Sequence, residues 1–324
     1  MTNAIRIHEH GGPDVLKWEA VEVGAPGEKE VRIRHTAIGL NYIDTYHRSG
    51  LYKIPLPTVL GREGAGVIEA VGAAVTAFKA GDRVAYGAAP IGAYCEARLI
   101  PADRVVLIPA NVSDRQAASI MLKGMTAQYL LRRTYAVQAG DTVLVQAAAG
   151  GVGLILCQWA RHLGATVIGT VGSDEKGELA KAHGCDHVIN YSREDFAARV
   201  AEITGGRKCA AVYDGVGKDT FLKSLDCLRP RGVMASFGNA SGKVEPFDLG
   251  ILAAKGSLYV TRPTLDTHVA TRADLVATAD DLFDVVGRGI VKVEINQTYA
   301  LKDTAQAHRD LEARKTTGST VLLP

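Results

Sequence analysis

The sequence lacks the cysteine patterns of disulfide-rich, redox-motif and metal-clip proteins. Its cysteines are odd in number and widely separated, and no two lie closer than 18 residues: Cys95, Cys157, Cys185, Cys209 and Cys227. This spacing excludes a CxxC motif and argues against a disulfide framework. We therefore expect the protein to work in a reducing compartment, the cytoplasm.

A surplus of one charge and a long apolar run are also missing. Lys and Arg number 37 and Asp and Glu 35, so the formal net charge is +2 over 324 residues. Because no basic run is interleaved with aromatic residues, we expect no main role in nucleic-acid binding. The uncharged stretch 142–160 contains two glutamines and three clustered glycines, so we expect no membrane span, and the N-terminus has no apolar core of signal-peptide length.

Glycine is abundant, and the order of apolar runs predicts two domains. The 35 glycines are about 11% of the chain, against a usual level of about 7%. Short strands separated by turn signals predict a compact, mostly β domain over residues 1–122. The next part alternates six apolar runs with helical segments, the pattern of a doubly wound parallel sheet. The runs are 142–147, 165–170, 187–189, 209–213, 233–236 and 257–260.

The C-terminal part has a different pattern. It predicts a helix over 274–286, a strand over 291–295, a helix over 304–314 and a strand over 319–323. These elements resemble the first region more than the α/β alternation. We therefore expect a discontinuous domain, residues 1–122 and 265–324, into which a nucleotide-binding unit of residues 123–264 is inserted.

The turn after the first strand of the α/β unit is rich in small residues. Ala148-Ala149-Gly150-Gly151-Val152-Gly153 follows an apolar strand and begins a helix. A dinucleotide site needs such residues for a tight turn, for close approach of the pyrophosphate and for helix–strand packing. The phosphates then lie at the unpaired N–H groups of the helix N-terminus. A glycine-rich turn without a ligand is the alternative interpretation.

The end of the second strand favours NADP over NAD. An NAD site places Asp or Glu about 20 residues after the glycines, where it binds the ribose 2′-hydroxyl. Here the strand ends at Gly172-Ser173 with no carboxylate at its tip, although Asp174 and Glu175 follow. Lys176 and Tyr191 complete a set of side chains that suits a 2′-phosphate, because lysine supplies a point charge.

Motifs along nearly the whole chain resemble the zinc-independent quinone oxidoreductase branch of the medium-chain dehydrogenase/reductase superfamily. They include the glycine-rich turn with Gln158 and Arg161, Asn41-Tyr42-Ile43-Asp44-x-Tyr46, Gly61-x-Glu63-Gly64-x-Gly66 and Tyr259-Val260-x-Arg262-Pro263. The resemblance implies a Rossmann doubly wound parallel sheet inserted into a GroES-like, mostly β catalytic domain. It also implies NADPH as cofactor, a quinone or conjugated carbonyl as substrate, and a homodimer paired along residues 257–262.

The resemblance also assigns site residues. Asn41 and Tyr46 are expected near the nicotinamide, with Tyr52 at the mouth of the pocket, because an amide and two phenols can donate hydrogen bonds to a carbonyl oxygen. The expected cofactor contacts are Asn41, Tyr46, Thr126, Gly150, Gly151, Val152, Gly153, Gly172, Ser173, Lys176, Tyr191, Phe237, Gly238, Val260, Arg262 and Arg314. No metal ligands are expected: Asn41 stands near the position of a zinc-ligating cysteine, and Gly61-Arg62-Glu63 replaces a Gly-His-Glu motif.

These residues leave three functions open. The first is NADPH-dependent reduction of quinones by hydride transfer without a metal. The second is reduction of α,β-unsaturated aldehydes or ketones, which differs in the substrate and not in the cofactor. The third is a nucleotide-binding protein of the same fold with a structural or regulatory role.

Overall fold

The computed structural model describes residues 1–324, which divide into two compact units. Unit 1 comprises Met1–Met125, His268–Gly287 and Val293–Pro324, and unit 2 comprises Thr126–Thr267 and Arg288–Lys292. The main boundaries between the units thus follow Met125 and Thr267, whereas the sequence predicts them after residues 122 and 264. Residues 288–292 belong to unit 2 because the Gln158 amide donates to Lys292 O at 3.2 Å and accepts from Lys292 N at 2.8 Å.

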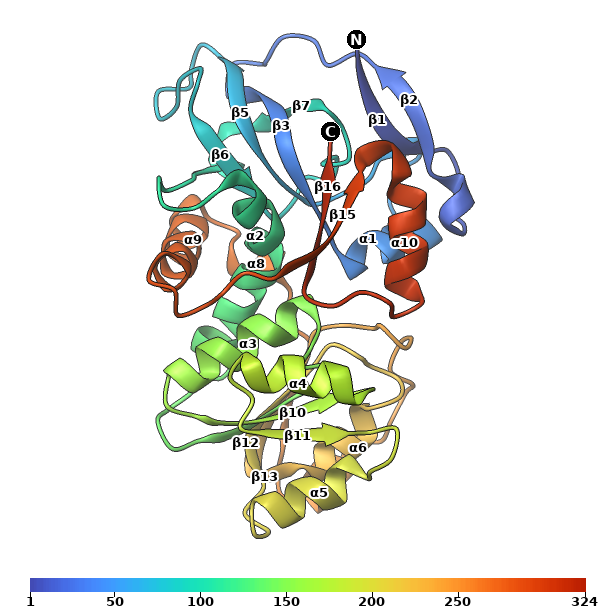
Figure 1. The fold of residues 1–324 in the computed structure, drawn as a ribbon, viewed down its shortest axis with the longest axis vertical. Coiled ribbons are helices and arrows are strands. Elements are labelled where there is room, and N and C mark those ends of the chain that lie inside the picture. Colours follow the sequence, from blue (N-terminus) through green and yellow to red (C-terminus); the bar gives the residue numbers. More distant parts are fainter. The chain divides into compact units, whose positions relative to one another are not determined.

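Unit 1 is built on two sheets, whose strands appear in Figure 1. The larger has the order β15-β16-β3-β5-β6-β8, with β7 paired to β3, and the smaller has the order β2-β1-β4. The strands of unit 1 are β1 (Thr2–Ile7), β2 (Lys17–Val21), β3 (Glu30–Leu40), β4 (Thr58–Val59), β5 (Glu63–Val71), β6 (Arg83–Tyr86), β7 (Ala97–Pro101), β8 (Val106–Leu107), β15 (Ile295–Ala300) and β16 (Ser319–Leu323). The predicted β-rich domain is therefore present, with N-terminal and C-terminal strands in one sheet.

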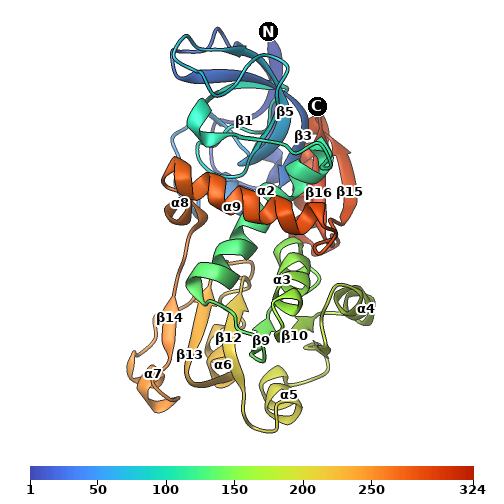
Figure 2. The ribbon, with the colours of Figure 1, turned by 90° about the vertical axis from the view of Figure 1, so that its left-hand side faces the viewer.

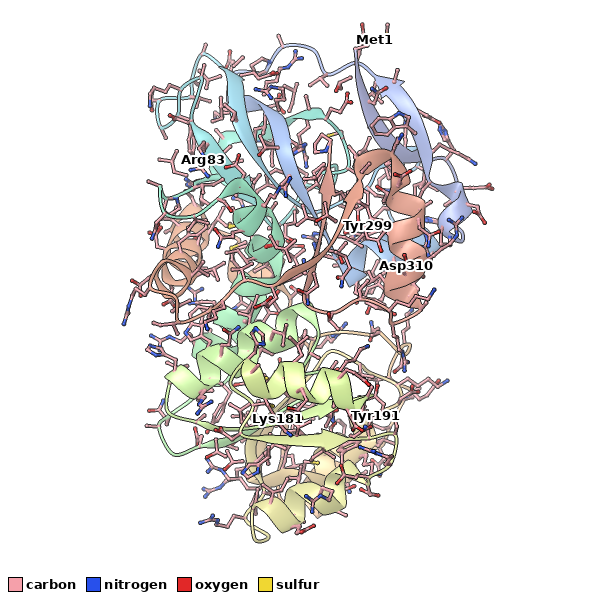
Figure 3. The ribbon with its side chains drawn as sticks, in the orientation of Figure 1. Met1, Arg83, Lys181, Tyr191, Tyr299 and Asp310 are labelled. Carbon is pink, nitrogen blue, oxygen red and sulfur yellow. The ribbon has the colours of Figure 1, made fainter.

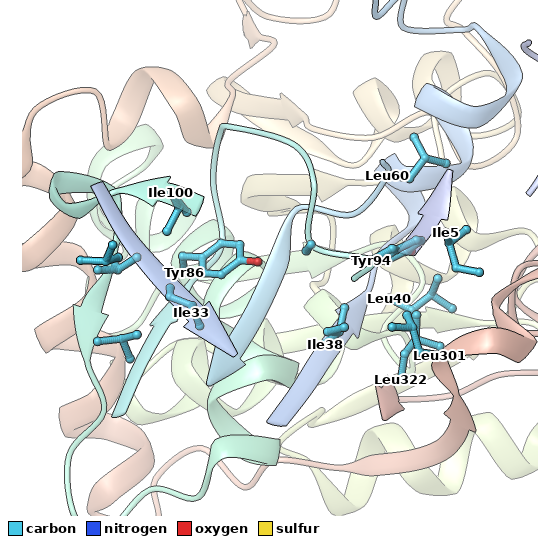
Figure 4. Close-up of a cluster of buried hydrophobic side chains, with 14 of the residues drawn as sticks. Ile5, Ile33, Ile38, Leu40, Leu60, Tyr86, Tyr94, Ile100, Leu301 and Leu322 are labelled. Carbon is cyan, nitrogen blue, oxygen red and sulfur yellow. The ribbon is translucent and has the colours of Figure 1, made fainter. Parts of the chain in front are cut away.

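The core of unit 1 is formed by the inward side chains of these strands. Figure 4 shows Ile33 and Ile38 of β3 in one apolar cluster with Tyr86, Tyr94 and Leu322. All five are almost completely buried. Burial of apolar area at about 25 cal/mol per Å² drives this packing. The cluster joins residues from both ends of the chain, so the C-terminal strand is an integral part of the domain.

The helices of unit 1 lie beside these sheets. Their bounds are α1 (Tyr42–Ser49), α2 (Asp114–Tyr129, whose residues from Thr126 on belong to unit 2), α9 (Arg272–Gly287) and α10 (Thr304–Glu312). The short α8 (Leu265–His268), which precedes α9, belongs to unit 2 except for His268. The sequence predicts two helical pieces, 116–121 and 126–133, where the structure has the single helix α2. The helix continues through Gly124. A Cβ at this position would lie 2.4 Å from Leu282 Cδ1 of α9, so the glycine permits close packing of the two helices.

Unit 2 contains one six-stranded parallel sheet, as predicted. Its order is β11-β10-β9-β12-β13-β14. Figure 2 labels β14, β13, β12, β9 and β10 of this sheet, together with α3 and α4. The strands are β9 (Thr142–Val145), β10 (Thr166–Val171), β11 (His187–Asn190), β12 (Cys209–Asp214), β13 (Leu228–Ser236) and β14 (Tyr259–Thr261), and the helices are α3 (Gly151–His162), α4 (Asp174–Ala182), α5 (Phe196–Ile203), α6 (Phe221–Asp226) and α7 (Gly250–Ala254). The chain reverses its direction across the sheet between β9 and β12, and ligands of such sheets bind at the carboxyl ends beside this reversal.

One predicted strand is wrong. The sequence places it at residues 291–295, whereas β15 begins at Ile295 and ends at Ala300. The Gln158 amide holds both backbone polar groups of Lys292, so this part of the chain is not free to join the sheet of unit 1. The remaining C-terminal elements lie close to their predicted positions.

Two further expectations concern cysteine and membrane insertion. All five cysteines are buried and free. No helix has the length and apolar character that crossing a bilayer requires.

Candidate functional site

The first group of predicted site residues surrounds the N-terminus of α1 in unit 1. Asn41 is the N-cap, and its backbone N–H donates to Asp44 Oδ2 at 2.9 Å. Its amide nitrogen donates to Glu63 Oε2 at 2.8 Å and to Gly39 O at 3.4 Å. Asn41 is 4% exposed, so both N–H groups of a buried amide are directed to acceptors within the protein.

Glu63 at the start of β5 is the centre of this group. Its carboxylate is fully buried and accepts from Asn41 Nδ2, from Leu122 N at 2.8 Å and from Lys123 Nζ at 3.0 Å. A Cβ on Gly39 would lie 2.1 Å from Glu63 Oε2, so only glycine permits this approach of β3 to the carboxylate. A buried ion pair of this kind is retained only when further hydrogen bonds satisfy it, as they do here.

A second set of buried polar groups extends from Asp44 to α10. Arg48 Nη1 lies 2.9 Å from His308 Nδ1, His308 Nε2 lies 3.2 Å from the Tyr94 hydroxyl, and that hydroxyl donates to Asp44 Oδ2 at 2.7 Å. Because arginine only donates, His308 Nδ1 accepts and its Nε2–H donates to Tyr94. The hydrogen bonds therefore run in one direction, from Arg48 to Asp44. Glu312 accepts two hydrogen bonds from Arg48, at 3.0 and 2.7 Å, and completes the arrangement.

Burial sets the protonation states of the groups in this hydrogen-bonded set. Desolvation, aided by the positive charge of Arg48, lowers the pKa of His308 to about 3, so the imidazole is neutral near pH 7. Desolvation raises the pKa of Asp44 to about 6, although hydrogen bonds from Tyr94 and from Asn41 N and the charges of Arg62 and Lys123 oppose the rise. Asp44 Oδ1 is buried and has no hydrogen-bond partner.

The predicted tyrosines form an aromatic cluster on and after α1. The Tyr46 ring lies 5.7 Å from the Tyr42 ring and 5.2 Å from the Tyr52 ring, centroid to centroid, and Tyr52 N donates to Tyr46 O at 3.1 Å. The His47 ring is 6.0 Å from Tyr52. Such edge-on aromatic contacts orient the rings. Tyr46 and Tyr52 thus belong to one local cluster, and their contact with substrate or cofactor stays a prediction.

The donor set around Asn41 does not fit a catalytic zinc. Such a zinc takes three Cys, His, Asp or Glu ligands and an open position. The structure brings the cations Arg62 and Lys123 close to Asp44, and the Glu63 carboxylate binds Lys123. No group of three or more His, Cys, Asp or Glu side chains is arranged to hold a metal ion.

The glycine-rich turn of unit 2 has the geometry of an anion cradle. Gly150 is the N-cap of α3, so Gly151, Val152 and Gly153 form the first turn, where backbone N–H groups are unpaired. A Cβ on Gly153 would lie 2.4 Å from Ala147 O, and Ala147 itself has φ of 55°. The backbone therefore folds back closely on itself, and only glycine at position 153 permits the turn.

Of the residues proposed for the adenosine phosphate, Ser173, Lys176 and Tyr191 follow the carboxyl ends of β10 and β11 in unit 2, whereas Arg314 belongs to unit 1. A Cβ on Gly172 would lie 2.6 Å from Tyr191 Oη, so the phenol lies directly over the glycine. Ser173 is the N-cap of α4 and accepts from Lys176 N. Tyr191 is 44% exposed, and Figure 3 labels it.

The carboxylate of Asp174 is already engaged at this edge. It accepts from Asn190 Nδ2 at 3.0 Å and forms an ion pair with Arg193. Hydrogen bonds from Asn190 and the charge of Arg193 lower the pKa of Asp174, which keeps it ionised. Its charge is therefore balanced by an arginine that sequence reasoning did not select.

The other predicted cofactor residues lie in different places. Thr126 is buried on α2 beside Tyr129. Phe237 and Gly238 follow β13, where Phe237 N donates to Asp214 O at 2.8 Å and a Cβ on Gly238 would lie 2.2 Å from Gly215 O. Val260 is in β14, and the Arg262 guanidinium donates to Ser236 O at 2.7 Å. Arg314 follows α10 in unit 1 with φ of 59°.

Comparison with known proteins identifies the family. The alcohol dehydrogenase GroES-like domain matches residues 27–133, and the zinc-binding dehydrogenase domain matches residues 151–284. A Pseudomonas aeruginosa protein named quinone oxidoreductase is 55% identical over 325 residues, with all of both chains covered. The chain belongs to the quinone oxidoreductase branch of the medium-chain dehydrogenase/reductase superfamily.

Two other similar proteins differ in what they act on or hold. The crystal structure of Escherichia coli quinone oxidoreductase complexed with NADPH has a TM-score of 0.97 and 50% identity, covering 99% of this chain and all of that one. A 2-haloacrylate reductase of Burkholderia sp is 50% identical over 335 residues, covering all of this chain and 99% of that one. The predicted family, the oxidoreductase class and the inserted Rossmann fold are confirmed.

Sequence reasoning missed part of the site in unit 1. The sequence motifs include Glu63 and Asp44, and Arg62 serves as evidence against zinc, but none of these three residues, nor Lys123 or His308, is among the predicted site residues. Lys123 lies sixty positions from its carboxylate partner. A lysine within an apolar helical segment was the available signal, because lysine is rarely fully buried unless it is paired.

Proposed function

We propose that the protein reduces quinones with NADPH, by hydride transfer and without a metal. The observation that carries the proposal is the edge of β10, where Gly172, Ser173, Lys176 and Tyr191 gather and Asp174 is bound to Arg193. A site for NAD would present a carboxylate free to bind the ribose 2′-hydroxyl. The relatives named quinone oxidoreductase and the E. coli structure with NADPH support the same function.

The residues of unit 2 hold the cofactor in this proposal. N–H groups of Gly151, Val152 and Gly153 bind the pyrophosphate, and Lys176 and Tyr191 bind the 2′-phosphate by charge and hydrogen bond. We place Thr126, Phe237, Gly238, Val260, Arg262 and Arg314 as further cofactor contacts. When bound, NADPH supplies the hydride, and the protein supplies orientation and electrostatics.

The aromatic cluster on α1 supplies the substrate end. Tyr46 and Tyr52 present flat faces against which a quinone ring can stack, and their hydroxyls can donate to its oxygen. Asn41 fixes the start of α1 because its side-chain amide donates to Glu63 and its backbone N–H donates to Asp44, and it thereby positions Tyr46. A quinone is already conjugated, so its reduction makes a small demand on a Lewis acid.

The cofactor preference can be tested with one variant and one matched control. Lys176→Met removes the proposed phosphate contact, while Lys181→Met changes another lysine of α4, which pairs with Glu178 at 2.9 Å. Fluorescence titration should show NADPH bound more tightly than NADH by the wild type. We expect Lys176→Met to bind NADPH about tenfold more weakly than the wild type, corresponding to about 1.4 kcal/mol, and Lys181→Met to bind it as tightly as the wild type.

This titration, together with an assay of quinone reduction, can also refute the proposed function. Equal affinity of the wild type for NADPH and NADH would refute the cofactor assignment. Binding of NADPH without oxidation by any quinone would refute the enzymatic role and favour the structural or regulatory alternative. Quinone reduction that a chelator abolishes and zinc restores would refute the metal-free reaction.

Reduction of conjugated carbonyl compounds is the second candidate. It is favoured by the relative that is named 2-haloacrylate reductase, which is as similar to this chain as the E. coli structure is. A panel of quinones, enones, enals and 2-haloacrylates, compared by kcat/KM, separates the two. Higher kcat/KM for any of the latter classes than for every quinone would replace the first proposal.

The proposal extends to assembly and location. The edge strand β14 pairs only with β13, and its Tyr259 side chain is 61% exposed. An unpaired strand edge with an apolar side chain invites pairing with a second copy. We therefore propose a homodimer through residues 257–262, and a cytoplasmic location in keeping with five free, buried thiols.

A further inference from the structure

Lys123 is a buried cation whose donors are mostly unused. Its side chain is 8% exposed, and its ammonium makes one hydrogen bond, to Glu63 Oε2 at 3.0 Å. An ammonium has three N–H donors, and buried donors are nearly always satisfied. Two donors of Lys123 are therefore available to a group that the chain itself does not provide.

The neighbouring side chain of Asn41, in contrast, has no unused hydrogen-bond donor. Asn41 Nδ2 shares the same oxygen, Glu63 Oε2, so the two nitrogens are adjacent. Both amide hydrogens of Asn41 are directed to Glu63 and to Gly39 O. Of the two side-chain nitrogen donors around this carboxylate, only Lys123 has hydrogens left for an outside acceptor.

We propose that Lys123 is a catalytic residue that donates a hydrogen bond to the substrate oxygen on which negative charge develops. Glu63 is then a positioning residue, because it holds the ammonium in place and makes no contact of its own with substrate. The inference rests on the proposed quinone reduction and deepens it. It assigns to Lys123 the donor role that sequence reasoning gives to Asn41.

A cation at this place would speed the reaction, although a conjugated quinone does not require a Lewis acid. Addition of a hydride, one proton with two electrons, to a quinone leaves a hydroquinone monoanion, and one further proton from water completes the hydroquinone. The negative charge resides on a phenolate-type oxygen. A preorganised ammonium in a buried site stabilises that oxygen more than it stabilises the neutral carbonyl, which lowers the barrier. Lys123 would supply by a fixed charge what a metal supplies as a Lewis acid.

The first test uses the wild-type protein and does not require turnover. The probe is 4-nitrophenol, whose phenolate absorbs visible light and which NADPH-type hydride transfer does not reduce as a quinone. It is titrated into the full chain with NADP⁺ present, across neutral pH. We expect the phenolate to bind at least about tenfold more tightly than the phenol, because a charge-assisted hydrogen bond favours the anion.

The second test compares variants. In Lys123→Met the preference for the phenolate should disappear, and kcat for quinone should fall about 100-fold, the usual effect of losing one oxyanion donor. Lys123→Arg, which keeps the charge, should retain most of the preference. Lys302→Met replaces an exposed lysine of unit 1 and should behave as the wild type does.

Folding and the underlying function have their own controls. If Lys123→Met does not fold, because Glu63 is left unpaired, Glu63→Gln with Lys123→Met removes both charges and takes its place. If the wild type does not reduce quinones but binds the phenolate more tightly than the phenol, the proposed function is refuted and the oxyanion site is supported. An active wild type with no phenolate preference, or a folded Lys123→Met that keeps both properties, refutes the role of Lys123.

Discussion

Acid should destabilise unit 1 through His308, and the structure sets the size of the effect. Desolvation lowers the pKa of this imidazole from 6.5 to about 3 in the folded protein. The unfolded chain therefore binds the proton first, and the stability present above about pH 6.5 is lost as the pH falls toward 3. At 1.36 kcal/mol per pKa unit, the loss between pH 7 and 4 is about 3 kcal/mol.

His308→Gln removes the titration and keeps the hydrogen bonds. Glutamine supplies an acceptor toward Arg48 and a donor toward Tyr94, as the neutral imidazole does. We expect a cost of about 1 kcal/mol at pH 7, from imperfect geometry, and a shallower loss of stability on acidification. His35, whose pKa burial lowers to about 4, stays in both proteins and leaves a remaining slope.

The assay is urea unfolding followed by circular dichroism at several pH values between about 7 and 4. His8→Gln, a change at an exposed histidine, is the matched control. The difference in unfolding free energy between wild type and His308→Gln should narrow and then reverse as the pH falls. Parallel curves for the two proteins would show that His308 does not take up the proton on unfolding, and the reasoning would fail.

Three further predictions follow from single contacts. Gly172→Ala should weaken NADPH binding about tenfold with little change in melting temperature, since the new methyl displaces only the half-exposed end of Tyr191; unchanged NADPH affinity would contradict this. Gly153→Ala should instead lower the melting temperature, because its methyl meets the backbone of the glycine-rich turn; a variant as stable as the wild type would disprove the close approach. Asp44→Asn should gain about 2 kcal/mol relative to the wild type between pH 4 and 7 in urea unfolding, because the buried carboxyl, with its pKa raised to about 6, loses stability as the pH rises through that value; a constant difference would count against it.

Much of unit 2 was predictable because its elements are signalled locally. Each strand of a parallel sheet is an apolar run, and each turn is marked within a few residues. The glycine-rich turn lies at the predicted place because the steric demand at Gly153 is local, between residues that are six apart or fewer. The prediction of a strand at residues 291–295 was wrong because the backbone of Lys292 is bound by Gln158, which is far away in the sequence.

The site in unit 1 was only partly predictable. Asn41, Tyr46 and Tyr52 lie within one short segment, so their proximity follows from α1. Whether the Asn41 amide has a free donor depends on Glu63, which β5 brings alongside β3, and nothing in the local sequence states this.

The sequence by itself determined the family and most of the order of elements, because periodicity, glycine spacing and motif identity are properties of the chain. Only the tertiary structure decided which polar groups share a buried environment. It placed Lys123 on the carboxylate of Glu63 and joined His308 to Arg48 across 260 positions. Desolvation acts on groups according to their neighbours in space, so hydrogen-bond capacity and shifted pKa values appear only when the chain is folded.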